Sequence, residues 1–463
     1  MKTYNQTSDS PDLPATKGVE TLLGNPKKAI IKLSLPMIVA MSAQTLYNFV
    51  DALWVSGLGP DALSAVGFFF PFMFMIMALS VGLGVGGSSA VSRRIGAGDK
   101  PGVDSVASHT IVLMFVLAVL VGIPFFLAAP RIFVSMGAGP IAPAATAYGR
   151  ILFAGTLVIF FGNIGSALLR GEGDVKRAML AMMLGAGLNI GLDPVFIFVL
   201  DLGVAGAAWA TLISLFISSG ILFFWICVRH DTYLSINLRG FRFRKEIVKD
   251  IFRVGIPSSV QQLSMAFSVF LINIIAVKVA GTDGVAVFTT GWRMVTFATL
   301  PLIGMATAVT STTGAAYGSR DIHKLNTAYM YAIRIGLFIE LGVAALTYFL
   351  APYIAALFTM VEEGLRIRAD ITVFLRTMCF FYPFTAFGML TSSMFQGTGK
   401  GLYSLTVTLI RTIFLTVPIA YLMAVVFKYD LSGLWWGIVS GNILGSAVAF
   451  AWGRRLIFDL KRK

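Results

Sequence analysis

The sequence is poor in charged residues, cysteine and histidine. Asp, Glu, Lys and Arg make up 13% of its 463 residues, whereas roughly a quarter of the residues in a soluble domain carry charge. This scarcity excludes a soluble enzyme. The 2 cysteines form no pair motif and the 3 histidines have no metal-ligand spacing, which argues against a disulfide framework and a zinc site. No phosphate-binding GxxxxGK[ST] loop occurs, so nothing supports ATP hydrolysis by this chain.

Long apolar runs take up most of the chain. Hydrophobic residues make up 57% of the sequence, and its mean hydropathy is +0.83. The runs are roughly 20 to 25 residues long, the length of a helix that crosses a bilayer, and we count about twelve of them. The alternating polar and apolar segments of an outer-membrane barrel do not occur. The sequence therefore predicts an all-α polytopic membrane protein with twelve transmembrane helices.

Lysine and arginine gather in alternate breaks between these runs and near both termini. By our count about 26 of the 36 basic residues lie on one side. Because positive residues stay in the cytoplasm during insertion, we expect both termini there, in a multi-pass protein of the plasma membrane. The net charge of +14 then sets orientation and requires no nucleic acid partner. Residues 1–28 are expected to form a polar cytoplasmic tail without a signal peptide.

The two halves of the chain look like copies. Four residues of the first half recur in the same order and at one constant interval in the second: Asp61, Gly82, Gly96 and Asp99 match Asp283, Gly304, Gly318 and Asp321. Further along, Gly162 and Gly171 match Gly388 and Gly397 at a slightly longer interval, as a short insertion would produce. Such halves would be parallel repeats, as in two-lobed secondary transporters with the substrate site between the repeats. The sequence predicts an N-lobe at 29–228, a basic cytoplasmic linker at 229–253, a C-lobe at 254–456 and a basic cytoplasmic tail at 457–463.

Three acids fall within the predicted spans: Asp51, Asp193 and Glu340. An ionisable residue inside a membrane costs at least a few kcal/mol and usually has a function. Asp51 and Asp193 are expected at one depth, roughly 9 to 10 Å from the outer end of their helices, with Thr211 at roughly 12 Å. Further oxygen-bearing side chains should join this cluster, because Tyr47 and Asn189 each lie one helical turn before an acid. Asn163 of the fourth span lies deeper, near the level of Asn189, and could add an amide oxygen if its face turns inward.

All six of these residues belong to the first half. The positions that match Asp51 and Asp193 in the second half are Asn273 and Ile419. Carboxylate, amide and hydroxyl oxygens are ligands of small hard cations such as Na⁺, and closely spaced buried carboxylates can instead hold a proton. We therefore predict a cation-coupling site for Na⁺ or H⁺. The alternative is that both acids only bond to neighbouring helices.

Glu340 has no second acid near it in the sequence. We expect it to form a structural ion pair with Arg334, Arg293 or Arg411 rather than to take part in transport.

Pro36 and Pro257 fall near the start of the first predicted span of each half. A proline inside a helix removes a hydrogen bond and kinks the helix, so Pro36 could be a conformational hinge. The alternative is that each proline lies in the first turn of its helix, where it costs little.

Three sequence features resemble the multidrug and toxic compound extrusion (MATE) family. They are Pro36 followed by Tyr-Asn-Phe-Val-Asp at 47–51, Arg-Gly-Glu-Gly-Asp at 170–174 and Asn-Ile-Gly-Leu-Asp-Pro at 189–194. The likeness runs from about residue 29 to 456. It implies a monomeric, cofactor-free antiporter that exports organic cations and amphipathic drugs in exchange for Na⁺ or H⁺, by alternating access of two lobes around a central cavity.

The resemblance favours the DinF-like branch of that family. The NorM-like branch carries a glutamate in the seventh span, where this chain has Gln261 and Gln262 followed by uncharged residues. In the DinF-like branch the coupling residues lie in the first lobe. The resemblance implies cation-site roles for Asp51, Asn189, Asp193 and Thr211, with Tyr47 and Asn163 beside them. The chain departs from the family pattern at Ser166, where the family has a second amide.

Other functions remain open at this point. A lipid-linked saccharide flippase shares the superfamily fold, but its cavity should be basic, and Arg293 and Arg411 are few. A channel needs a continuous polar path, which the spans lack. A membrane-embedded aspartyl-type enzyme could use Asp51 and Asp193 as its acid pair.

Overall fold

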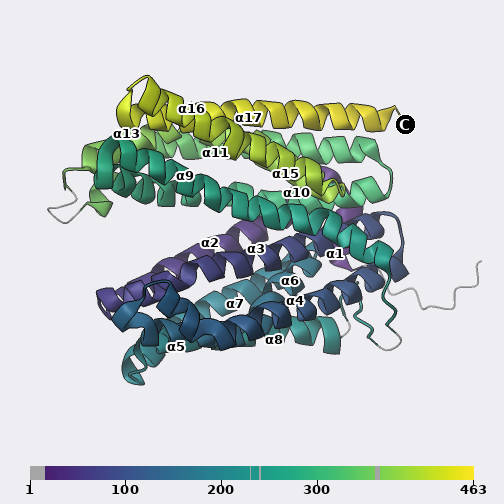
Figure 1. Cartoon of the computed structure of the whole chain (residues 1–463). Helices are drawn as coiled ribbons and strands as arrows, with labels where there is room; N and C mark the ends of the chain where they lie inside the picture. The colour runs from purple at the N-terminus through teal and green to yellow at the C-terminus, as the bar shows by residue number, and fades with distance from the viewer. Residues whose placement is uncertain (1–15, 230, 239–240, 360–364, 463) are drawn as a thin grey trace, which may run out of the picture.

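The computed structural model describes residues 16–229, 231–238, 241–359 and 365–462. His230 and Arg239 of the predicted linker, and most of the predicted N-terminal tail, lie outside this part. The described chain forms two bundles of long, roughly parallel helices that lie one above the other in Figure 1. The lower bundle comes from the first half of the sequence and the upper from the second.

The N-lobe begins with a short helix that is followed by the long helices. Its elements are α1 (Lys17–Leu23), α2 (Pro26–Ser56), α3 (Pro60–Gly96), α4 (Lys100–Ser135), η1 (Gly139–Ile141), α5 (Ala142–Ala154), α6 (Thr156–Gly171), α7 (Val175–Pro194), η2 (Val195–Val199), α8 (Gly203–Phe223) and η3 (Phe224–Val228). The segments η2 and η3 are π-helical continuations of α7 and α8.

The C-lobe repeats this order of helices. Its elements are α9 (Lys245–Ala298), α10 (Leu300–Gly318), α11 (Ile322–Phe358), α13 (Arg368–Met378), α14 (Tyr382–Gly397), α15 (Gly401–Leu409), η4 (Ile410–Thr416), α16 (Val417–Tyr421), η5 (Leu422–Val426) and α17 (Asp430–Lys461).

These elements form twelve membrane-spanning segments within the described residues. Nine helices are long and apolar enough to cross a bilayer. Two bent pairs, α5 with α6 and α13 with α14, each make one further span, with bends of 49° and 55°. Helix α9 counts twice, because Ala280 and Gly281 leave the helical conformation and its second part continues into α10. The predicted all-helical fold of two six-span lobes is confirmed.

The predicted repeat appears in how matched helices begin. Asp99 caps α4 by accepting a hydrogen bond from the backbone N–H of Gly102, and Asp321 caps α11 by accepting one from Lys324. Such a cap satisfies a backbone donor that has no partner within the helix. The two capping residues are one of the matched pairs of the internal repeat.

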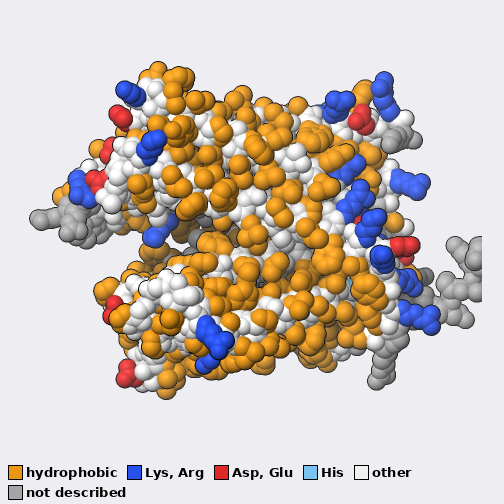
Figure 2. All heavy atoms as spheres, viewed as in Figure 1, with side chains coloured by type: hydrophobic (Ala, Val, Ile, Leu, Met, Phe, Trp, Pro, Cys, Tyr) orange, Lys and Arg blue, Asp and Glu red, His pale blue; other side chains and the backbone are white. Residues whose placement is uncertain are grey.

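Glycines bring the two lobes together at the end of the molecule where α1 and the C-terminus lie. Helix α3 packs along α9, and α2 packs along α10. A Cβ atom on Gly96 would overlap the carbonyl oxygen of Ala315, and one on Gly318 would overlap that of Arg93. We call this the termini end. Figure 2 shows a cleft between the lobes at the opposite end, and shows most Lys and Arg side chains of this face at the termini end.

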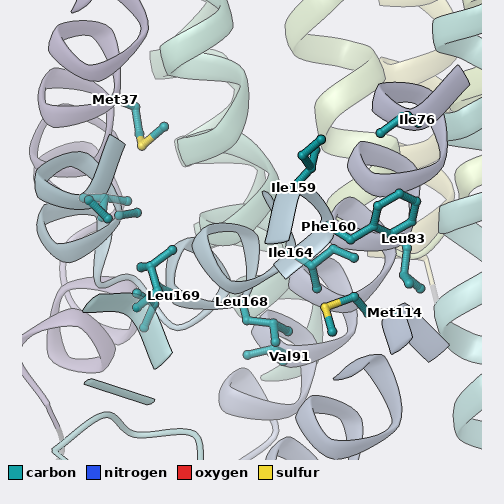
Figure 3. Close-up of a cluster of buried hydrophobic side chains, with 14 of the residues drawn as sticks. Met37, Ile76, Leu83, Val91, Met114, Ile159, Phe160, Ile164, Leu168 and Leu169 are labelled. Atoms are coloured by element: carbon teal, nitrogen blue, oxygen red, sulfur yellow. The ribbon is translucent and has the colours of Figure 1, made fainter. Parts of the chain in front are cut away.

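Small and apolar side chains fill the interior of each lobe. Figure 3 shows part of the N-lobe core, where Leu83 of α3, Met114 of α4 and Phe160 of α6 point toward one another. The short helix α1, which falls within the predicted polar tail, also packs here. Its Val19 and Leu22 are buried, and the side chain of Lys324 donates a hydrogen bond to the carbonyl of Leu23.

Candidate functional site

The end of α7 carries the centre of a polar cluster. Asn189 and Asp193 lie one turn apart, so they share one face of this helix. Pro194 follows directly, and the chain continues as the π-helix η2 rather than as regular α-helix. Because proline has no N–H to donate, the local helical bonding changes at this point, and π-helical turns often occur at functional sites.

Asn189, Asp193 and Thr211 are joined by hydrogen bonds. The Asn189 side-chain amide donates to Asp193 Oδ1 at 3.2 Å and lies 3.3 Å from Thr211 Oγ1 on α8. The exposed fractions of the three residues are 2%, 0% and 7%. These contacts bring together three side chains that the sequence groups in one cluster, and their role in cation coupling stays a prediction.

Helix α2, which packs against the other lobe, supplies two more members of the polar cluster. The Asp51 carboxyl group is in direct contact with that of Asp193. One turn earlier, the Tyr47 hydroxyl contacts the side chain of Thr211. Both α2 residues are only half-buried. We call Tyr47, Asp51, Asn189, Asp193 and Thr211 the N-lobe polar cluster.

Among the residues that the structure describes, three oxygen atoms of this cluster are buried without a hydrogen-bond donor: Asp51 Oδ1, Asn189 Oδ1 and Asp193 Oδ2. A buried polar atom without a partner costs free energy. Two carboxyl groups in contact cannot both carry uncompensated charge. A small cation that contacts these oxygens would remove both costs, whereas a proton between the two carboxyl groups would relieve the acids and leave Asn189 Oδ1 without a donor. The atoms that could bind a cation in this cluster are all oxygens, which suits a hard cation.

Asn163 lies apart from this cluster. Its amide nitrogen is 3.4 Å from Ser80 Oγ and 3.2 Å from the carbonyl of Ile159, and it also contacts the sulfur of Met77. None of these hydrogen bonds reaches an acid.

Pro36 lies inside α2, ten residues after the helix begins at Pro26. Pro257 likewise lies inside α9, which begins at Lys245. Neither proline is in a first turn, so the low-cost alternative for these residues was wrong. Each removes a hydrogen bond from the interior of a long helix.

Sequence reasoning missed Tyr148. This residue of α5 is 9% exposed, and its side chain is close enough to Asp51, Asp193 and Tyr47 to interact with them electrostatically. It lies six residues after the start of α5, roughly 9 Å along the helix. Measured from the observed start of α5, that depth matches Asp51. The apolar run of the fourth span starts only near residue 149, so depth counting from the sequence leaves Tyr148 outside the span.

Glu340 is isolated in the C-lobe. It is 0% exposed, and neither of its carboxylate oxygens has a hydrogen-bond partner. Among the described residues it forms no ion pair, so the expected pairing with Arg334, Arg293 or Arg411 is not found.

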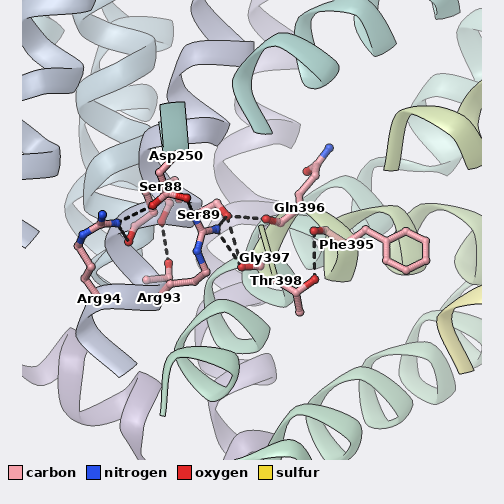
Figure 4. A network of polar contacts seen from close by, with 11 residues as sticks. Ser88, Ser89, Arg93, Arg94, Asp250, Phe395, Gln396, Gly397 and Thr398 are labelled. Carbon is pink, nitrogen blue, oxygen red and sulfur yellow. Dashed lines mark hydrogen bonds and ion pairs between the residues drawn. The ribbon is translucent and has the colours of Figure 1, made fainter. Parts of the chain in front are cut away.

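A second polar network joins the lobes at the termini end (Figure 4). Arg93 and Arg94 of α3 bind the two carboxylate oxygens of Asp250 on α9 at 2.7 Å and 2.8 Å. Ser89 donates a hydrogen bond to the carbonyl of Gln396 on α14. These contacts hold the helices together where the glycines bring the lobes into contact.

A buried acid fixes the linker to the N-lobe at the same end. The Glu172 carboxylate follows α6, is 0% exposed, and accepts a hydrogen bond of 2.8 Å from the backbone N–H of Leu234. Its other oxygen has no partner. Burial disfavours the charged form and raises the pKa of Glu172 to about 8, although the bond from Leu234 opposes this shift.

A family comparison identifies the kind of protein that carries this cluster. The family model described as MatE matches residues 36–195 and 257–422, one stretch in each lobe. The chain belongs to the MatE family. This match confirms the resemblance noted in the sequence. Members of the family are membrane transporters and not enzymes, so the alternative of a membrane-embedded aspartyl-type enzyme was wrong.

Similar proteins match this chain over nearly its whole length. A probable multidrug resistance protein NorM of Thermotoga maritima is 25% identical and covers 94% of this chain and 93% of its own. A multidrug export protein MepA of Staphylococcus aureus is 25% identical over 91% and 92%. A solved outward-facing structure of a multidrug resistance MATE family transporter is 51% identical, with a TM-score of 0.94 over 97% of this chain and 100% of its own.

Proposed function

We propose that this MatE protein is a secondary active multidrug exporter that extrudes organic cations and amphipathic drugs in exchange for Na⁺ or H⁺. The observation that carries the proposal is that three buried oxygens, on Asp51, Asn189 and Asp193, accept no hydrogen bond from the described residues. They lie in a contact between two acids and belong to one lobe. The names of the NorM and MepA relatives support drugs as the substrate class.

The coupling follows from competition for the same negative charge. With both carboxylates ionised, the N-lobe polar cluster favours a lipophilic cation in the cleft. When Na⁺ or H⁺ binds, it neutralises the cluster and weakens the binding of the drug. A ligand shifts a conformational equilibrium only if its affinity differs between the two states. Asp51 is half-buried on α2, which faces the other lobe, so occupation of the cluster can change how α2 packs.

Pro36 is the hinge in this proposal. It lies fifteen residues before Asp51 on the same helix, and the backbone there lacks one hydrogen bond. Near Pro36, α10 approaches α2 so closely that a Cβ atom on Gly304 would come within 2.8 Å of the Ile38 backbone. Bending α2 at Pro36 would therefore change a contact between the lobes.

The orientation belongs to the same proposal. Basic residues gather at the termini end in Figure 2, and positive residues stay in the cytoplasm during insertion. We infer that the termini end is cytoplasmic in the plasma membrane and that the cleft opens outward. The residues 29–228 and 254–456 then act as the two moving lobes of one monomer, joined by the linker at 229–253.

Proteoliposomes can test this function and its coupling ion. The purified chain would be reconstituted, and transport of the fluorescent cation ethidium would be followed under an imposed Na⁺ gradient with the pH gradient collapsed by an ionophore. Transport in this experiment indicates Na⁺ coupling, and transport under a pH gradient alone indicates H⁺ coupling. If neither gradient drives ethidium movement in protein-containing vesicles beyond that in empty vesicles, the proposed function is wrong.

A further inference from the structure

Each lobe carries an exposed arginine that lies over an aromatic ring. In the N-lobe, the guanidinium carbon of Arg150 on α5 is 5.4 Å from the ring centre of Phe126 on α4. In the C-lobe, that of Arg376 on α13 is 5.2 Å from the ring centre of Tyr348 on α11. Both arginine side chains are exposed. We call these the two arginine–aromatic pairs.

The two pairs are copies of one feature. The two aromatic residues are separated by the same interval as Asp61 and Asp283 of the internal repeat. The two arginines are separated by the slightly longer interval between Gly171 and Gly397. Arg150 lies eight residues after the start of α5, and Arg376 lies eight residues after the start of α13. This spacing places each arginine roughly 12 Å along its helix from the end opposite the termini.

Neither arginine has an acidic partner among the residues that the structure describes. Their neighbours on the surface are apolar: Leu127 is 67% exposed beside the first pair and Phe349 is 74% exposed beside the second. Stacking on a ring uses the flat face of a guanidinium and leaves its five N–H donors at the edge unoccupied. A charged group with free donors on a lipid-facing surface needs an acceptor, and a lipid headgroup can supply one.

The N-lobe also has a groove that ends at its arginine. This groove, of about 280 Å³, lies between α4 and the α5–α6 bend and is lined almost entirely by apolar side chains, among them Val119, Ile123, Phe126 and Leu157. Arg150 lies one turn from the lining residue Ala154. Arg131 lies one turn beyond Leu127 on α4, on the same helix face. The mouth of the groove is therefore basic and its floor is apolar.

We propose that each arginine–aromatic pair binds the phosphate of a phospholipid in the leaflet opposite the termini end, and that an acyl chain of the N-lobe lipid occupies the groove. A phosphate accepts two parallel N–H bonds from one guanidinium, which occupies the donors that ring stacking leaves free. The ring holds the guanidinium plane in place, and the long arginine side chain extends toward the headgroup level. Binding at matched sites would anchor both lobes to the same leaflet.

Native mass spectrometry on the full-length protein in detergent tests the proposal. The delipidated protein would be titrated with dioleoylphosphatidylglycerol, and in parallel with dioleoylglycerol, which has the same chains and no phosphate. The wild type is expected to bind two phosphatidylglycerol molecules tightly. Arg150→Gln and Arg376→Gln should each weaken one site roughly tenfold, the effect of losing about 1.4 kcal/mol of charge-assisted bonding. The double variant should bind no molecule of phosphatidylglycerol tightly.

Arg366→Gln is the matched control. Arg366 is also an exposed arginine of the C-lobe, but Asp283 neutralises it at 2.6 Å. Its substitution should leave lipid binding unchanged. Ile123→Trp fills the groove while keeping both arginines, so it should remove the N-lobe lipid alone. A lipid-free melting curve for each variant establishes that it is folded.

Several results would overturn the proposal. They are a double variant that binds phosphatidylglycerol as the wild type does, equal binding of dioleoylglycerol, and a loss in Arg366→Gln as large as that in Arg150→Gln. Unchanged lipid binding by Ile123→Trp would refute the place of the acyl chain in the groove.

Discussion

The two lobes share their helix plan and differ in their polar interiors. Matched aspartates cap α4 and α11, matched bends divide the fourth span of each lobe, and matched arginines stack on matched rings. In the N-lobe, two acids, an amide and hydroxyl groups meet in one cluster. The C-lobe has Asn273 at the position of Asp51, and its amide donates to its own helix, at the carbonyl of Val269.

The difference teaches which features belong to the scaffold. Caps, bends and glycine contacts are needed wherever six such helices pack, so both copies keep them. The acid cluster is found in one copy, and the matched positions Asn273 and Ile419 show that a few different side chains are enough for a lobe with the same helix plan to lack it. Function in this fold therefore resides in individual side chains rather than in the helix arrangement.

The largest expected effect comes from neutralising the N-lobe acids. Asp193→Asn or Asp51→Asn removes one of the two charges for which, in the proposed mechanism, Na⁺ or H⁺ and the drug compete. We expect gradient-driven ethidium transport to fall roughly 5- to 150-fold, the range of typical coupling free energies. Initial rates in proteoliposomes, normalised to the amount of folded protein, measure this effect.

Glu340→Gln is the C-lobe control for that experiment. Glu340 is as deeply buried as Asp193, but it has no second acid in contact with it. We expect the transport rate to stay within about twofold of the wild type, less than about 0.5 kcal/mol. If Glu340→Gln lowers transport as much as Asp193→Asn does, coupling is not confined to the N-lobe.

The next effect tests a feature that the lobes share. Gly96→Ala and Gly318→Ala each introduce a Cβ atom that overlaps a backbone carbonyl of the other lobe. Overpacking of this kind costs about 1 to 3 kcal/mol. Both variants should lower the melting temperature by similar amounts in a thermal unfolding assay.

Gly187→Ala is the control for overpacking. Gly187 lies within α7, and nothing is within 4 Å of the position of its Cβ. Alanine is a better helix former than glycine, so this variant should melt at or above the wild-type temperature. A melting temperature for Gly96→Ala above that of Gly187→Ala would show that the close contact between the lobes is not needed.

Apolar run lengths and matched residues were sufficient to predict the twelve spans and the repeat, because lipid admits a helix of nearly fixed length. The i, i+4 spacing and depth counting also grouped Asp51, Asn189, Asp193 and Thr211, which are in contact in the structure, and their role in coupling stays a prediction. Asn163 was expected to join them only if its face turned inward, because depth does not say which way a side chain faces; in the structure its amide bonds to Ser80 and the Ile159 carbonyl. Helix α1 escaped notice because seven residues give too short a pattern to recognise.

The third prediction contrasts matched turns of the lobes. Glu172 follows α6 in the N-lobe, and the matched residue after α14 is the uncharged Thr398. The pKa of Glu172 is raised from 4.5 to about 8, so the folded chain holds this proton more tightly than the unfolded chain does. Its contribution to stability is complete below pH 4.5 and is lost as the pH rises to about 8. The wild type should therefore melt at a lower temperature at pH 8 than at pH 5, by about 2 to 4 °C for each kcal/mol of stability lost.

Glu172→Gln should remove most of this pH dependence, because glutamine stays neutral and still offers an oxygen to the Leu234 N–H. Thr398→Val is the matched C-lobe control and should keep the wild-type pH dependence. An undiminished pH dependence in Glu172→Gln would mean that another group titrates.

The smallest effect should come from making one N-lobe position identical to its C-lobe counterpart. Tyr148 lies beside the acids, and the matched residue of the second half is Phe374. Tyr148→Phe removes a single hydroxyl group and keeps the ring packed against Phe69. The loss of one polar group near the acids is worth at most about 1 kcal/mol, so the coupling-ion concentration for half-maximal transport should change by less than about fivefold. A change at constant maximal rate would mean that Tyr148 tunes the affinity of the N-lobe polar cluster, whereas a fall in maximal rate alone would mean that Tyr148 acts on the conformational change.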